Sequence, residues 1–149
     1  MRTRLGRYAR AISTLAVVTA FMLAVSARAE TITYAADLKG ASEVPPNDSS
    51  GKGTVLAIYE STTKKLVWTV TYSGLTGPAT AAHFHGPAAA DANAGPIITL
   101  DAAKLASPAK GEATLTDAQA AELAKGMWYL NVHTAAHPPG EIRGQLMKK

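Results

Sequence analysis

The chain has 149 residues and contains no cysteine. Disulfide bonds, thiolate metal ligands and thiolate nucleophiles are therefore excluded. A lipid-anchoring lipobox is excluded for the same reason. Because small secreted animal modules usually depend on disulfides, an exported chain without cysteine favours a bacterial-type envelope protein.

Several enzyme motifs are also absent. No serine lies in a G-x-S-x-G elbow, and the sequence contains neither a glycine-rich phosphate loop nor an H-E-x-x-H zinc motif. The common kinds of hydrolase chemistry therefore have no support in the sequence. The sequence also lacks a long run of residues with the same charge.

The first 29 residues have the pattern of a secretory signal peptide. An almost wholly apolar segment, residues 11–25, is followed by Ala27 and Ala29 at a small-x-small cleavage site. A basic start precedes it, formed by Arg2, Arg4, Arg7 and Arg10. The apolar run of about 15 residues is short for a membrane span, and no adjacent arginine pair marks the twin-arginine route. We expect cleavage after Ala29 and a periplasmic or secreted protein.

Removal of this leader changes the charge of the chain. The leader carries five arginines and no acidic residue, so 10 Lys and Arg and 11 Asp and Glu remain, a net charge of −1. The mature chain, residues 30–149, therefore lacks the basic character that nucleic-acid binding requires. It also lacks a membrane span, and its length fits one domain.

Period-two alternation of apolar and polar residues predicts a series of short strands. The expected strands are residues 32–38, 54–59, 66–72, 79–85, 97–100, 111–115, 127–133 and 141–146. One short helix is expected over residues 118–125, with Thr116 as N-cap and Gly126 after its end. This pattern predicts an all-β fold, a Greek-key sandwich or flattened barrel with one short helix.

All four histidines lie in two short motifs. His83 and His85 form an H-x-H pair on an expected strand, where residues i and i+2 point to the same face. If Phe84 enters the core, both imidazoles face outward or into a cleft. His133 ends another expected strand, and His137 follows four residues later, before a stiff Pro-Pro-Gly segment.

Four imidazoles without a thiolate predict a metal site made of His83, His85, His133 and His137. Neutral imidazole is a common ligand of copper, zinc and nickel. The affinity order places Cu(II) above Zn(II), so copper is the expected metal and zinc the alternative. A structural role for the histidines, as hydrogen-bonding groups that tie loops to strands, remains the competing interpretation.

Three charged residues are candidates for positioning the histidine ligands. Glu141 and Arg143 share a face of the last expected strand, where they could form a structural ion pair or orient imidazoles. Glu43 precedes two prolines and could reach the same site or form a salt bridge. For Arg143 the structural role is the favoured interpretation.

Four segments of the chain resemble the CHRD domain, a family first described in chordin. They are residues 36–46 (ADLKGASEVPP), 82–87 (AHFHGP), 129–134 (YLNVHT) and 139–146 (PGEIRGQL). Their order and spacing are similar to the family pattern over about residues 33–146. The resemblance implies an all-β, immunoglobulin-like domain of secreted and envelope proteins, and implies little about activity.

A fainter similarity links His83, His85 and His133 to copper-zinc superoxide dismutase, which also holds copper on an H-x-H strand of a Greek-key barrel. In a dismutase-like enzyme Arg143 would guide superoxide to the ion. Three hypotheses therefore stand: copper sequestration, transfer or redox handling; a metal-free interaction module for another envelope protein or a glycan; and a copper-only dismutase-like enzyme. The interaction module predicts an exposed apolar patch near residues 86–96.

Overall fold

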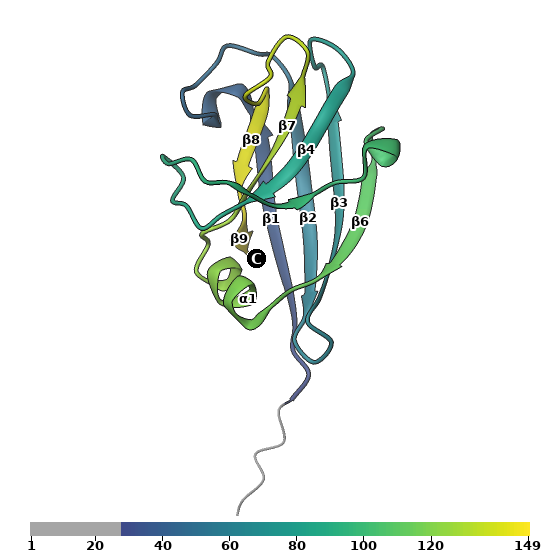
Figure 1. The fold of residues 1–149 in the computed structure, drawn as a ribbon, viewed down its shortest axis with the longest axis vertical. Helices are drawn as coiled ribbons and strands as arrows, with labels where there is room; N and C mark the ends of the chain where they lie inside the picture. Colours follow the sequence, from purple (N-terminus) through teal and green to yellow (C-terminus); the bar gives the residue numbers. More distant parts are fainter. Residues whose placement is uncertain (1–27) are drawn as a thin grey trace, which may run out of the picture.

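The computed structural model describes residues 28–149 (Figure 1). The predicted signal peptide therefore lies almost entirely outside the described residues. The described chain forms nine strands and one α-helix, α1 (Asp117–Ala124). The strands are β1 (Thr31–Lys39), β2 (Lys52–Glu60), β3 (Lys65–Ser73), β4 (Ala79–His85), β5 (Pro96–Thr99), β6 (Ala109–Thr114), β7 (Tyr129–Thr134), β8 (Ile142–Gln145) and β9 (Met147–Lys148). Two 3-10 turns, Gly40–Ser42 and Ala102–Lys104, complete the described elements.

The strands pair antiparallel in the order β5-β4-β7-β8-β1-β2-β3-β6, with β9 added to β1. This sheet folds over itself into a nearly closed barrel. Trp68 on β3 and Phe84 on β4 are distant in the strand order, yet their ring centroids lie 5.1 Å apart, edge to face. The predicted all-β class with one short helix is confirmed.

Alternation along the strands separates a core face from an outer face, as period-two patterning predicts. On β2 and β3 the inward side chains are buried, and those between them are mostly exposed or half-buried. Phe84, between the two histidines of β4, is 0% exposed and enters the core. Burial of this kind contributes about 25 cal/mol per Å² of apolar surface and is the main force closing the barrel.

The helix α1 begins and ends one residue before the predicted bounds of 118–125, and Thr116 is its N-cap as predicted. Thr116 accepts a hydrogen bond from the Gln119 backbone N–H, and the Gln119 side chain accepts one from the Thr116 N–H, a complete capping box. Gly126, at φ +69°, turns the chain back toward β7 after the helix ends. No helix among the described residues is long and apolar enough to cross a membrane.

The outer face of β4, β7 and β8 is polar but is not simply exposed to solvent. The register places His83 opposite Asn131, and Asn131 opposite Arg143 on the far side of β7. The segment between β4 and β5 lies against this face, because Gln145 and Arg143 donate hydrogen bonds to its carbonyls at Ala88 and Ala92. This arrangement creates a covered polar layer outside the barrel wall, and the histidines lie in it.

Candidate metal centre

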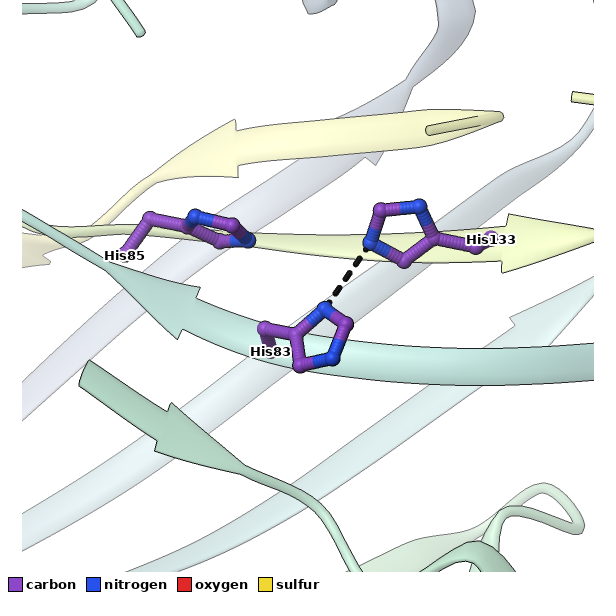
Figure 2. A group of neighbouring side chains, drawn as sticks. All are labelled: His83, His85 and His133. Carbon is purple, nitrogen blue, oxygen red and sulfur yellow. Dashed lines mark hydrogen bonds between the residues drawn. The ribbon is translucent and has the colours of Figure 1, made fainter. Parts of the chain in front are cut away.

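The two histidine motifs meet because β4 and β7 are neighbours in the sheet (Figure 2). His83 and His85 project from one face of β4, and His133 projects from the same face of β7. One ring nitrogen from each residue lies within 4.8 Å of the others. His85 is 8% exposed, while His83 and His133 are half-buried.

The closest approach within the group is between His83 Nδ1 and His133 Nε2, at 3.0 Å. Metal–imidazole bonds of about 2.0–2.1 Å place two cis ligand nitrogens about 3 Å apart. The same distance also suits a hydrogen bond from one imidazole to the other. The two nitrogens can therefore either form a hydrogen bond with each other or bind the same metal ion.

Backbone carbonyls fix the protonation of the other ring nitrogens. His133 Nδ1 lies 2.8 Å from the Pro138 carbonyl, and His85 Nδ1 lies 2.9 Å from the Ala94 carbonyl. Since a carbonyl oxygen only accepts, both Nδ1 atoms carry hydrogen, and each Nε2 keeps its lone pair in the neutral ring. Metal-bound histidines commonly hold their second nitrogen in this way.

The surroundings also keep two of the rings neutral. Burial lowers the pKa of His83, and the nearby His133 and His85 lower it further. Burial lowers the pKa of His133 as well, against the opposing effect of its hydrogen bond to Pro138. Because metals bind the unprotonated imidazole, these pKa shifts favour the binding-competent form at neutral pH.

His137 lies outside this group of three. It occupies the turn between β7 and β8, where its backbone N–H donates to the Thr134 carbonyl and its carbonyl accepts from the Gly140 N–H. The structure therefore brings together three of the four predicted ligands. The fourth contributes its backbone to the turn that holds the Pro138 carbonyl against His133.

A stacked column runs through the site from β4 to β8. The Tyr129 ring lies parallel to the His85 ring, with 2° between their planes and 4.7 Å between centroids. The Arg143 guanidinium carbon lies 3.4 Å from the centroid of the same tyrosine ring. Because β7 lies between β4 and β8, Tyr129 is sandwiched between the imidazole and the cation.

Arg143 binds the segment between β4 and β5, which covers the polar face of the sheet, and does not point toward the histidines. Its guanidinium donates to the Ala92 carbonyl at 2.7 Å and to Asn93 Oδ1 at 2.8 Å, and the side chain is 1% exposed. No salt bridge joins it to Glu141 among the described residues. Its predicted structural role fits these contacts, whereas guiding an anion to the histidines would require an accessible guanidinium.

We expect Arg143→Lys to lower the free energy of unfolding by about 2 kcal/mol, measured by equilibrium urea denaturation. An ammonium keeps the charge but loses the planar fork that reaches Ala92 and Asn93 together. Lys110→Arg, an exposed exchange of the same two residue types, should change stability by less than about 0.5 kcal/mol. Equal stability of both variants and the wild type would contradict the assigned role.

Glu141 is buried, and hydroxyl donors rather than a cation stabilise its carboxylate charge. Its carboxylate accepts from Ser49 Oγ at 2.7 Å, Thr76 Oγ1 at 2.8 Å and Thr134 Oγ1 at 2.5 Å. Burial alone would raise its pKa, but these hydrogen bonds, with one from the Thr76 N–H, lower it overall. Glu141 thus links the loops that contain Ser49 and Thr76 to Thr134 at the end of β7. Its side chain does not contact His133, which is the chain neighbour of Thr134.

Glu43 approaches the site from a different side. It is 6% exposed, and its Oε1 has no hydrogen-bond partner among the described residues. A Cβ placed on Gly140 would lie 2.5 Å from this oxygen and 2.7 Å from Asn131 Nδ2. Glu43 and Asn131 therefore flank Gly140, a position with φ +143° where a side chain is excluded.

Two residues of the site escaped the sequence analysis. Tyr129 is 2% exposed, because the segment after β4 covers its ring and donates a hydrogen bond from the Ala94 N–H to its hydroxyl. Asn131 is 3% exposed, lies opposite His83 in the strand register, and contacts His85 through its side chain. Its only sequence signal is its place two residues before His133, which puts it on the ligand face of the strand.

Chemically, the three imidazoles offer a nitrogen-rich, thiolate-free set of metal ligands. The histidine cluster lies in the segment of the chain that the family comparison covers. A model of the CHRD domain family matches residues 34–146. No curated protein and no solved structure matches the chain. This match includes all nine strands except the first three residues of β1 and the two of β9, and the chain belongs to the CHRD domain family.

Proposed function

We propose that this CHRD domain is an exported protein that binds Cu(II) through His83, His85 and His133, for copper sequestration, transfer or redox handling. One observation carries the proposal: a ring nitrogen from each histidine lies within 4.8 Å of the other two, on adjacent strands. His133 follows His83 by 50 positions and His85 by 48 positions in the sequence. Only the β4–β7 pairing brings them together, on a face where core packing does not require them.

The donor set favours copper. Imidazole nitrogens without thiolate or thioether suit Cu(II), and Cu(II) stands above Zn(II) in affinity for such sites. The carbonyl partners of His85 and His133 also support this role, since they aim each Nε2 lone pair away from the backbone. Zn(II) is the alternative metal.

Export rests on the sequence alone. The basic start, the apolar segment of residues 11–25 and the Ala27-x-Ala29 site support a cleaved leader, and the absence of cysteine suits an envelope protein. Amino-terminal sequencing of the protein recovered from the periplasm or medium should give Glu30 first. An intact Met1 would contradict cleavage.

The alternative, a metal-free interaction module, predicts an apolar patch near residues 86–96. The large exposed apolar side chains of the described chain lie elsewhere. They are Leu56 and Ile58 on β2, Val67 on β3 and Met147 on β9. The segment from 86 to 96 exposes mainly small residues, so this observation does not favour the alternative.

The test uses the full chain, expressed with its leader and purified under copper-replete conditions. We expect one equivalent of copper by elemental analysis and nitrogen hyperfine structure in its electron paramagnetic resonance spectrum. His137→Ala, which removes a histidine outside the cluster, should keep both the stoichiometry and the spectrum. Absence of tight copper would return the histidines to a structural role, and loss of copper in His137→Ala would show a different ligand set.

A further inference from the structure

Both ring nitrogens of His85 face carbonyl oxygens, those of Ala94 and of the Asn131 side chain. His85 Nε2 lies 3.0 Å from Asn131 Oδ1. A neutral imidazole has one N–H, and when Nδ1 donates it to the Ala94 carbonyl, Nε2 presents a lone pair to Asn131. A lone pair therefore faces a carbonyl oxygen, and a cation between the two atoms would turn this repulsion into attraction.

The orientation of the Asn131 amide is set from its other end. Asn131 Nδ2 donates to the Pro139 carbonyl at 3.4 Å. Because a backbone carbonyl only accepts, the amide NH2 belongs on this side. A flipped amide would place its oxygen against the Pro139 carbonyl, which leaves Oδ1 facing His85 as the consistent arrangement.

The strand register places Asn131 on the same face of the sheet as the three imidazoles. Asn131 is directly opposite His83 on β4, and it is two residues before His133 on the same face of β7. Its 3.0 Å separation from His85 Nε2 equals the separation of His83 Nδ1 from His133 Nε2. Both values match the spacing of about 3 Å between cis ligands of one ion.

From this geometry we propose that Asn131 Oδ1 is a fourth ligand, completing a three-nitrogen, one-oxygen site with His83 Nδ1, His85 Nε2 and His133 Nε2. The inference rests on the proposed metal function and adds a ligand to it. The amide oxygen is neutral and hard, whereas imidazole is intermediate in softness. Asn131 therefore selects Cu(II) over Cu(I), because the softer cuprous ion gains less from a carbonyl oxygen.

Comparing Cu(II) with Cu(I) affinity therefore tests whether Asn131 is a metal ligand or only positions His85. We expect Asn131→Ala to weaken Cu(II) binding by about 10- to 100-fold and Cu(I) binding by distinctly less, both by competition with chelators of known affinity. Loss of a mere positioning contact would weaken both oxidation states alike. Asn131→Asp, which supplies an anionic oxygen at the same place, should restore or tighten Cu(II) binding.

A spectroscopic test observes the bond itself. The sequence has only three asparagines, Asn47, Asn93 and Asn131, so labelling the side-chain carbonyl carbon of asparagine with 13C is selective. The Cu(II)-loaded full chain should show a 13C hyperfine coupling by electron nuclear double resonance. That coupling should disappear in Asn131→Ala and persist in His137→Ala.

The possible outcomes distinguish this inference from the function on which it rests. Wild-type protein that binds Cu(II) with nitrogen hyperfine structure, but shows no 13C coupling and the same affinity in Asn131→Ala, overturns the fourth ligand and leaves the histidine site standing. Wild-type protein without tight copper overturns both. Circular dichroism of metal-free Asn131→Ala and Asn131→Asp verifies folding, and Asn131→Asp keeps the test decisive if the alanine variant is unstable.

Discussion

Replacing His83 and His85 together by alanine abolishes tight Cu(II) binding if the β4–β7 cluster is the metal site. The double variant keeps a single imidazole of the three, His133. Loss of an outer hydrogen-bond partner of a metal ligand already costs about 10- to 100-fold in affinity, so loss of two ligands should exceed 100-fold. Isothermal titration of the metal-free protein with Cu(II) gives the affinity directly.

Stability provides a second measurement of the same effect. Copper at about 100 times its dissociation constant should stabilise the wild type by about 2.7 kcal/mol, because it binds only the folded chain. This increment should vanish in the double variant and persist in His137→Ala. His83→Ala alone, at a half-buried position, serves if removal of the buried His85 perturbs folding. A double variant that retains the copper increment would place the metal elsewhere.

The period-two patterns were sufficient to predict the strands, because each strand has one face in the core. The prediction for residues 79–85 coincides with β4, and Phe84 enters the core as expected. The two-residue strand β9 was missed, since two residues cannot display an alternation. The order of strands in the sheet was also beyond a sequence pattern, because pairing partners such as β4 and β7 are separated by four other elements.

The candidate site was predictable to the extent that it follows strand geometry. His83 and His85 share a face as the i, i+2 rule requires, and His133 joins them through the β4–β7 register. His137 depends on the path of an irregular turn, which no periodicity describes. Asn131 and Tyr129 acquire their roles only from a covering segment and a neighbouring strand, and those contacts are tertiary.

Coverage of the polar face also explains why Glu43 has an unusual environment. A carboxylate loses hydration on burial and needs donors or a cation in return. Glu141 receives four donors, whereas Glu43 Oε1 has none, and Arg143 acts on Glu43 only through its field. Burial therefore raises the pKa of Glu43 from 4.5 to about 7, with Arg143 lowering it in opposition.

This raised pKa makes stability depend on pH in a defined direction. Below pH 4.5 the carboxyl is protonated in both the folded and unfolded chains, so no difference arises. Between pH 4.5 and about 7 the unfolded chain releases the proton while the folded chain retains it, and folding loses stability as pH rises. A shift from 4.5 to about 7 corresponds to a loss of about 3 kcal/mol above pH 7.

Glu43→Gln removes this dependence, because a neutral amide of the same shape has no proton to lose. We expect the variant to have nearly the stability of the wild type at pH 4 and to exceed it by about 3 kcal/mol at pH 8. Urea denaturation of chelator-treated protein across this range measures the difference without metal binding at the histidines. An NMR titration of the Glu43 carboxyl carbon in the wild type should have its midpoint near the same window. A stability difference that stays constant from pH 4 to pH 8 would show that Glu43 is ionised normally, and that its unpartnered oxygen is solvated in the folded chain.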